Sequence, residues 1–310
     1  MTIPASARTV LVLGANGRFG RCAVQAFSQG GWQVIAHSRS ALVQPLPPNS
    51  SHLQCDALDT EALIAAAKGR VEVIVHALNP AYDDWERQVP ALTDSVLRLA
   101  QATGALLMLP GNVYNFGREL PPALTEDTPQ LANTSKAVQR IALEQRMQGT
   151  SGVQSVVIRA GDFIGGDGPG TWLDMVIAKK LDKGEATYLG PLDVEHAWAY
   201  LPDLAQVFVK VAERRAMLPA FSIFHYAGLA LNGYEFCTAL ERVTGRTLKI
   251  KPMPWWLLRL ASPFSGMMRA LLEMRYLWDR PHRLEESRLR ALIGEVPRTG
   301  IDAVLRKSCA

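Results

Sequence analysis

Gly14, Gly17 and Gly20 have a spacing that can hold a phosphate group. All three follow an apolar run and open a helical pattern, in 9-TVLVLGANGRFGRCAV-24. Gly14 permits a tight turn, Gly17 lets backbone N–H groups approach a pyrophosphate, and Gly20 lets the helix lie close to the strand. The anion then lies at a helix N-terminus, where unpaired N–H groups and the helix dipole stabilise it. This pattern predicts a dinucleotide-binding turn. The turn also contains Asn16, Arg18 and Phe19.

The residues at the end of the second expected strand bear on which dinucleotide binds. An NAD-preferring site usually has an acidic residue here, which holds the ribose diol. This chain instead has His37, Ser38 and Arg39, in 36-AHSRS-40. Arg39 can pair with a 2′-phosphate, and Ser38 can donate a hydrogen bond to it. We therefore predict NADP as the preferred cofactor over NAD. The alternative is that Arg39 is a solvated loop arginine.

Two further turns are expected to border the cofactor. Asp56 follows the third strand in 54-QCDALD-59, with Ala57 beside it. Its carboxylate can accept a hydrogen bond from the adenine amino group, or it can cap the following helix. After the fourth strand, the chain is expected to line the cofactor mainly through its backbone. These residues are His76, Ala77, Leu78 and Asn79.

The glycine turn needs a scaffold of strands and helices, and the first 160 residues have that pattern. Short apolar runs alternate with longer segments of helical periodicity. The strands are continuously apolar rather than alternating, which indicates a parallel sheet covered on both faces. The expected class is α/β, a Rossmann-type doubly wound parallel sheet. Strands are predicted at 9–14, 32–38, 52–57, 71–78, 105–111 and 153–161, and helices at 18–29, 59–67, 83–103 and from near Asn133.

The chain divides into a dinucleotide-binding domain at 1–160 and a region at 161–310 that is mostly a smaller substrate-binding lobe. A segment near 195–215 is expected to return to the first domain as a helix. The Gly-rich stretch 161-GDFIGGDGPG-170 suits a mobile substrate gate. In the interrupted apolar segment 252–274, two short amphipathic helices packed on the domain are favoured over a membrane-surface role. Helices are also predicted at 172–183, 202–215 and 232–244, and a strand at 247–254.

Composition limits the class of protein. Of 310 residues, 48% are hydrophobic and 20% charged, which is typical of a soluble globular protein. A formal charge of +4 is too small over this length to indicate a nucleic-acid surface. The four cysteines have no paired spacing, so neither a metal site nor a disulfide framework is indicated. Without a signal-peptide pattern or an uninterrupted apolar span, we expect a cytoplasmic protein with no stable membrane insertion. Its expected partner is a small-molecule substrate, and a homodimer is left open.

Short motifs spread along nearly the whole chain carry a family resemblance. They are GANGRFG, DALD after the third strand, VIVHALNP after the fourth, 111-GNVYNFG-117, TSK at 134–136, 158-IRAGDFIGG-166 and 199-AYLPDLAQVF-208. Together they resemble the extended short-chain dehydrogenase/reductases of the NAD-dependent epimerase/dehydratase family. The resemblance implies NAD(P) binding in the N-terminal domain, with nucleotide-sugars or other small carbonyl and hydroxyl compounds bound below the C-terminal lobe. It also implies that the backbone around Gly161 passes the nicotinamide amide.

The resemblance brings an expectation about catalysis that this chain only partly meets. The family's chemistry uses a Tyr four residues before a Lys, on one face of one helix. The lysine holds the nicotinamide ribose and lowers the pKa of the tyrosine, which passes the proton, while a Ser or Thr holds the substrate oxygen. Lys136 matches the lysine, but Ala132 stands at the tyrosine position and Pro110 at the Ser/Thr position. Two of the three catalytic side chains are therefore absent.

Three explanations of this departure are open. In the first, another residue supplies the proton, either Tyr114 or Tyr82, and Asn112 binds a substrate oxygen. The structural alternatives are that Tyr114 is a packed aromatic and Tyr82 a surface aromatic. In the second explanation the protein binds NADP as a sensor or scaffold without turnover. In the third, the substrate supplies its own acid–base group.

Three residues beyond the first domain are candidates for substrate contact. Trp172 follows the Gly-rich stretch, and His196 and Tyr200 lie together in 193-DVEHAWAYLPD-203. His196 can titrate near neutral pH and serve as an acid or base, although a lone histidine is more often structural.

Overall fold

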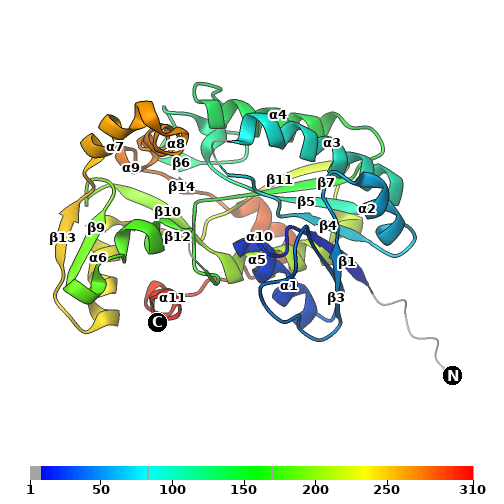
Figure 1. The fold of residues 1–310 in the computed structure, drawn as a ribbon, viewed down its shortest axis with the longest axis horizontal. Coiled ribbons are helices and arrows are strands. Elements are labelled where there is room, and N and C mark those ends of the chain that lie inside the picture. Colours follow the sequence, from blue (N-terminus) through cyan, green and yellow to red (C-terminus); the bar gives the residue numbers. More distant parts are fainter. Residues whose placement is uncertain (1–7, 82–83, 169, 310) are drawn as a thin grey trace.

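The centre of the molecule is a parallel β-sheet, seen in a computed structural model that describes residues 8–81, 84–168 and 170–309. Within these residues the sheet has seven strands, in the order β11-β7-β5-β4-β1-β2-β3 (Figure 1). All neighbouring strands run parallel. Together with helices on both faces, this order confirms the predicted α/β doubly wound class. The strands are β1 (Thr9–Leu13), β2 (Gln33–Ser38), β3 (Ser50–Gln54), β4 (Val73–His76), β5 (Leu106–Gly111), β7 (Ser155–Ala160) and β11 (Phe221–Tyr226).

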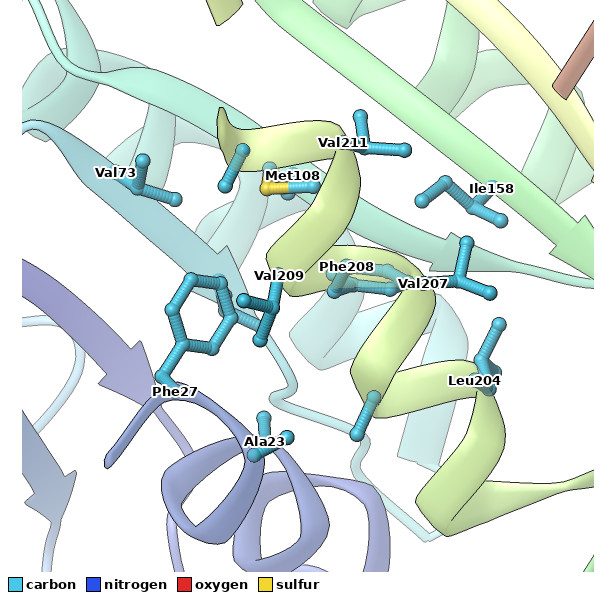
Figure 2. Packing of buried hydrophobic residues seen from close by; sticks show 14 of the residues in the cluster. Ala23, Phe27, Val73, Met108, Ile158, Leu204, Val207, Phe208, Val209 and Val211 are labelled. Atoms are coloured by element: carbon cyan, nitrogen blue, oxygen red, sulfur yellow. The ribbon is translucent and has the colours of Figure 1, made fainter. Parts of the chain in front are cut away.

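Helices cover both faces of the sheet because its central strands bury side chains on both sides. On one face α1 and α5 pack together, and the rings of Phe19 and Phe208 meet edge to face at 4.9 Å. Figure 2 shows this interface, where Phe27 and Val207 approach apolar side chains of the strands. α2, α3 and α4 cover the opposite face. The helices are α1 (Arg18–Gln29), α2 (Thr60–Ala67), α3 (Trp85–Thr103), α4 (Ser135–Gly149) and α5 (Leu201–Glu213).

A second lobe is built around large aromatic side chains. Tyr188, Trp198, Phe236 and Trp278 come from four elements, and each ring contacts two of the others. Such rings bury much apolar area per residue, which suits a small core. Its strands are β6 (Ala123–Leu124), β8 (Asp162–Ile164), β9 (Glu185–Tyr188), β10 (Glu195–Tyr200), β12 (Leu229–Asn232), β13 (Lys249–Pro252) and β14 (Arg283–Leu284). Its helices are α6 (Gly233–Thr244), α7 (Trp255–Ala261), α8 (Gly266–Glu273), α9 (Tyr276–Asp279) and α11 (Ile301–Ser308).

The chain returns to the first lobe several times after residue 160. α5 is the returning helix expected from the sequence. β11 then pairs with β7 and forms one edge of the sheet. α10 (Ser287–Ile293) packs on β11 and α5. The second half of the chain therefore completes the first lobe, beyond the division that the sequence suggested at residue 160.

One predicted helix is largely absent. The segment 172–183 forms a π-helical turn at Leu173–Ile177 and a 3-10 turn at Leu181–Lys183. Leu173 and Ile177 are buried, but the three lysines that follow are exposed. The segment thus lacks an apolar face long enough to hold a regular helix against the lobe.

The apolar segment 252–274 forms the two short helices that its pattern predicted. α7 and α8 pack against each other, and the Trp255 indole donates a hydrogen bond to the Leu189 carbonyl at 2.8 Å. Among the helices of the described ranges, each is too short or too polar to cross a lipid bilayer.

Candidate functional site

The three glycines form a tight turn between β1 and α1. Gly14 has a φ of +84°, and a Cβ there would lie 2.8 Å from the Ala77 carbonyl oxygen. A Cβ on Gly20 would overlap the Gly14 carbonyl oxygen. The Gly17 N–H donates to that same oxygen at 2.9 Å, and no side chain of the described residues caps α1. The turn therefore leaves space beside a helix N-terminus whose N–H groups can bind an anion.

His37 fixes the geometry of this turn through its backbone. Its carbonyl accepts hydrogen bonds from the N–H groups of Gly14 and Ala15, at 3.1 and 2.8 Å. Its imidazole is buried, with Nε2 3.1 Å from the Cys55 carbonyl oxygen. Burial lowers the pKa of His37, so the ring is neutral at pH 7. His37 thus supports the site as a structural residue.

The two residues after His37 differ in what they offer a ligand. The Ser38 hydroxyl donates to the Ser40 carbonyl at 2.6 Å, and it lies 2.8 Å from His52 Nε2. Arg39 is exposed and forms no ion pair within the described part of the chain. Arg39 is therefore the group at the end of β2 that a phosphate can reach without breaking an existing contact.

Asp56 and Ala57 form a turn after β3. The Asp56 carboxylate accepts from the Leu58 N–H at 2.9 Å. The cap of α2 is instead Asp59, which accepts from the Ala62 N–H at 3.1 Å. The capping role considered for Asp56 is thus excluded, and its exposed carboxylate remains a candidate for the adenine amino group.

Asn16 binds the loop that follows β2. Its Nδ2 donates to the Ala41 carbonyl at 2.9 Å, and its Oδ1 accepts from the Val43 N–H at 3.1 Å. Because these bonds span the turn and the loop, Asn16 sets the width of the space between the glycine turn and the Arg39 region.

Arg18 joins the glycine turn to the Gly-rich stretch of the second lobe. Its guanidinium donates to the Gly165 carbonyl at 2.9 Å and forms an ion pair with Asp174. Arg21, one turn further along α1, donates to the Asp167 carbonyl. These bonds hold the stretch against α1, whereas the sequence suggested a mobile gate.

Backbone from two other strands borders the same edge of the sheet. Ala77, Leu78 and Asn79 follow β4, and the Ala77 N–H donates to the Leu13 carbonyl at 3.0 Å. Gly161 follows β7, and a Cβ there would overlap the backbone of β10. The carboxyl ends of the parallel strands thus bring the predicted cofactor contacts to one edge, as in other doubly wound folds.

Lys136 lies in the first turn of α4, but Ala132 is not on this helix. α4 begins at Ser135, because the Thr134 hydroxyl accepts from the Ala137 N–H at 3.0 Å and caps it. Ala132 is exposed and precedes the cap by two residues. Positions 132 and 136 therefore do not share a helix face, and the sequence expectation on this point is wrong.

Lys136 and Tyr114 contact the same indole. The Lys136 ammonium lies 4.5 Å from the centroid of the Trp85 ring, and the Arg140 guanidinium lies 4.6 Å from it. The Tyr114 ring is 6.5 Å from Trp85. Lys136 and Tyr114 are only 3% and 7% exposed. The structure thus brings the lysine and one candidate phenol together, while Tyr82, the other candidate, lies outside the described residues.

Pro110 and Asn112 occupy the end of β5 and the turn after it. Pro110 pairs with Ile158 of β7 and offers no hydrogen-bond donor. The Asn112 side-chain carbonyl accepts from the Tyr114 N–H at 3.0 Å and holds the turn. The Asn112 amide group keeps two donor hydrogens, which can bind a substrate oxygen.

A buried ion pair anchors α4 to the sheet. Arg159, near the end of β7, donates to the Glu144 carboxylate at 2.6 Å, and both side chains are buried. The Arg159 guanidinium also lies 5.3 Å from the Phe116 ring. Because a buried pair fixes the relative position of its two elements, it holds the helix that carries Lys136.

The three residues proposed for substrate contact are packed in the second lobe. His196 Nε2 lies 2.9 Å from Asp162 Oδ2, and its ring stacks on Trp278 at 4.0 Å. Trp172 meets Trp278 edge to face at 5.9 Å, and Tyr200 is buried. These contacts hold β8 and β10 in place beside the site.

An open groove of about 710 Å³ lies between the start of α4 and α8. The Glu273 carboxylate, at the end of α8, accepts from the Ser135 N–H at 2.5 Å and so binds the N-terminus of α4. Most of the lining is polar, which suits a ligand with hydroxyl or phosphate groups. Its lining residues are Glu86, Arg118, Ser135, Lys136, Gln139, Gly266, Arg269, Ala270, Leu272 and Glu273.

Tyr276 joins this region and was not singled out from the sequence. Its hydroxyl oxygen is buried, and no hydrogen bond of ordinary geometry reaches it from the described residues; the Thr134 side chain is the nearby group that interacts with it. Burial raises the pKa of the phenol, the carboxylates of Glu273 and Asp162 raise it further, and Thr134 and Arg118 act in the opposite direction. In the sequence, Tyr276 belongs to an aromatic run that periodicity alone does not separate from an ordinary packed segment.

A comparison with family models supports the resemblance seen in the motifs. The model described as "NAD dependent epimerase/dehydratase family" matches residues 10–224. This span includes the glycine turn, the start of α4 and the segment after β7. A comparison with curated proteins gives no match.

Solved structures similar to this one extend over nearly the whole chain. A presumed epimerase from Burkholderia cenocepacia J2315 has a TM-score of 0.78 at 21% identity, covering 98% of this chain and 97% of that chain. The enzyme WbmH from Bordetella bronchiseptica, in complex with NAD+, has a TM-score of 0.76 at 15% identity, covering 98% and 97%. UDP-glucose 4-epimerase from Brucella ovis, in complex with NAD, has 0.76 at 16%, covering 98% of each chain. At these identities the likeness establishes the fold.

Proposed function

The chain belongs to the NAD-dependent epimerase/dehydratase family, and we propose that it is an NADP-binding oxidoreductase or epimerase with an unusual acid–base group. Its proposed substrate is a small compound with a carbonyl or hydroxyl group. The observation that carries the cofactor part is the glycine turn. Side chains at Gly14 or Gly20 would collide with backbone, and α1 offers uncapped N–H groups beside that space. A pyrophosphate fits this arrangement of shape and partial charge.

NADP is proposed in preference to NAD because of the charge at the end of β2. Arg39 is exposed without an ion-pair partner among the described residues, so it can bind a 2′-phosphate at little cost. The nearest acidic residue in the chain is Asp56, after β3, rather than at the end of β2 where a carboxylate would hold the ribose diol. The similar structures from Bordetella and Brucella contain NAD, so cofactor choice would distinguish this chain from them.

At the other end of the cofactor, Lys136 is proposed to hold the nicotinamide ribose. Its ammonium lies against the Trp85 ring in a buried position, where a hydrogen bond to a ribose hydroxyl would gain from low solvent screening. When bound, the dinucleotide supplies or accepts a hydride. The chain itself must bind the substrate oxygen and move its proton, and neither Ala132 nor Pro110 can do so.

Exchanging Arg39 for glutamate tests the cofactor proposal. Arg39→Glu should weaken NADPH binding roughly 10- to 100-fold, since a charge-assisted hydrogen bond contributes about 1.5–3 kcal/mol. NADH binding should change little. Both affinities can be measured from the fluorescence of the reduced nicotinamide. Arg70→Glu is the matched control, because Arg70 is equally exposed but precedes β4, at the opposite edge of the sheet.

Equal weakening of NADPH and NADH by Arg39→Glu would remove the argument for NADP. Stabilisation of the protein by ATP but by neither dinucleotide would contradict the cofactor assignment altogether.

A second function, an NADP-binding sensor without turnover, is favoured by the absence of a proton donor at positions 110 and 132. The two functions separate in one assay. An oxidoreductase consumes NADPH with at least one member of a panel of aldehydes, ketones and nucleotide-sugars. A sensor binds NADPH with the same Arg39 dependence but does not consume it.

A further inference from the structure

The second lobe contacts the N-terminus of α4, close in sequence to position 132, where the resemblance implies a tyrosine. Ala132 is exposed and outside α4, so the first turn of this helix presents Thr134, Ser135 and Lys136 without a phenol. The end of α8 binds directly to this turn, through the hydrogen bond from the Ser135 N–H to the Glu273 carboxylate at 2.5 Å. Glu273 also lines the groove that contains Lys136. The second lobe is therefore fixed against the N-terminus of α4.

Tyr276 follows three residues after this contact and has an unusual hydroxyl group. The oxygen is buried, and within the described residues no hydrogen bond of ordinary geometry reaches it, although the Thr134 side chain lies near enough to interact with it. Buried hydroxyl groups nearly always have one, so an exception calls for a ligand, a substrate or a water that completes the bond. Trp278, two residues on, stacks on His196 and fixes the direction of this segment.

The neighbours of the hydroxyl group come from both sides of the proposed nicotinamide site. Thr134 belongs to the cap of α4, two residues before Lys136. Asp162 begins β8 directly after Gly161, on the segment proposed to pass the nicotinamide. Asp162 is itself held by His196 at 2.9 Å. The phenol thus lies between the two segments that would border the reacting end of the cofactor.

We propose that Tyr276, supplied by the second lobe, is the phenol that binds the substrate oxygen and gives it a proton. The inference rests on the proposed function and deepens it, because it names the missing acid–base group. In a carbonyl reduction, the O–H bond of Tyr276 breaks as the O–H bond of the product alcohol forms. The reduced dinucleotide is the source of the hydride that joins the carbonyl carbon, and water reprotonates the phenolate.

The electrostatic surroundings keep the Tyr276 phenol protonated. Burial raises the pKa of the phenol, and the nearby carboxylates of Glu273 and Asp162 add to the effect, whereas the Thr134 side chain and the Arg118 guanidinium act to lower it. The group is therefore protonated at neutral pH and can donate a hydrogen bond to a substrate carbonyl. Tyr114, by comparison, is buried beside Trp85 in the turn after β5.

Fluorine NMR can test the placement without a known substrate. The chain has seven tyrosines, so protein made with 3-fluorotyrosine gives few lines, and Tyr276→Phe identifies its own by loss. Saturating NADP should shift the Tyr276 line and leave the line of Tyr188, in the second-lobe core, unchanged. A Tyr276 line that stays in place while NADPH fluorescence reports binding would overturn the inference alone. If no dinucleotide binds, the proposed function fails and the inference falls with it.

Kinetics test the role. On a carbonyl from the panel that the unaltered protein reduces, Tyr276→Phe should lower kcat about 100-fold or more, the typical contribution of a positioned acid. The KM for NADPH should not change. Tyr276→Phe removes at most a weak hydrogen bond to Thr134, so Tm should move by only about 2 °C. Tyr234→Phe, on the exposed surface of α6, is the matched control. A larger loss of kcat in Tyr114→Phe than in Tyr276→Phe would assign the role to Tyr114 instead.

Discussion

The two ends of the proposed cofactor site are built from different groups: backbone at one end and side chains at the other. At the pyrophosphate end, the site consists of backbone, and Gly14 and Gly20 are fixed there by contacts that admit no side chain. At the proposed nicotinamide end, the site consists of side chains, with Lys136 present and with Pro110 and Ala132 at the two positions where the resemblance implies a hydroxyl group. A binding site made of backbone geometry tolerates little change. An acid–base group can be supplied from another element, provided that its hydroxyl reaches the same point.

The largest difference in stability between the two ends is expected at acidic pH. Burial lowers the pKa of His76 to about 4, and those of His225 and His282 to about 3. None of these belongs to the glycine turn, and burial lowers the pKa of His37, which supports that turn, by less than it lowers theirs. Below pH 6.5 the unfolded chain binds protons that the folded chain cannot. The free energy of unfolding should therefore fall by up to about 1.4 kcal/mol per histidine for each pH unit, down to about pH 4.

Denaturant titrations at pH 7, 6 and 5 measure this slope. His282→Asn should reduce it by about one proton, because the His282 imidazole is buried. Amide exchange at pH 5 should show faster opening around α4 and the second lobe than around the glycine turn. A free energy that is constant between pH 7 and 5 would disprove the idea that these histidines are buried in the neutral form.

The next largest effect is expected from filling the glycine turn. Gly20→Val would force a side chain into the Gly14 carbonyl, and overpacking of this kind costs about 3 kcal/mol in the free energy of unfolding. NADPH affinity should fall at least about 100-fold, because α1 must move away from β1. Gly149→Ala, where a Cβ would meet no atom within 4 Å, is the control. Normal NADPH binding by Gly20→Val would show that the turn does not hold the pyrophosphate.

The smallest effect should come from the link between the ends. Asp174 pairs with Arg18 across the glycine turn, in a partly exposed position. Asp174→Asn should free Arg18 for the pyrophosphate and tighten NADPH binding roughly two- to fivefold, because one such partly exposed ion pair contributes about 0.5–1 kcal/mol. Asp302→Asn, which breaks the distant pair with Arg242, is the control for a general charge effect. Unchanged or weaker binding in Asp174→Asn would mean that the Asp174 carboxylate and the pyrophosphate do not compete for Arg18.

Much of the first lobe could be predicted from sequence because its signals are local. The buried strands and the glycine turn depend on runs of a few residues, and helix 18–29 agrees with α1 to the residue. The family resemblance was equally readable, since its motifs are short and lie in order along the chain. The domain boundary was harder, because nothing near Phe221–Tyr226 signals that it will pair with β7.

The site was less predictable where it depends on contacts between distant segments. The start of α4 was predicted near Asn133 and lies at Ser135, after the Thr134 cap, so Ala132 is not in its first turn. His37 has the right position for a ligand contact, but its imidazole lies at hydrogen-bond distance from the Cys55 carbonyl instead. Tyr276 is brought close to α4 by the contact of α8 with that helix, about 140 residues away in sequence. No local sequence pattern predicts a contact between segments so far apart.

The late arrival of β11 has a consequence for how the protein is made. During synthesis, β7 emerges long before Phe221–Tyr226, so its outer edge has no partner for the time it takes to make some sixty residues. An unpaired and mostly apolar strand that is buried in the folded protein can pair with other nascent chains. The N-terminal lobe should therefore need chaperone protection on the ribosome, and a fragment that stops at residue 160 should aggregate rather than fold as an independent dinucleotide-binding domain.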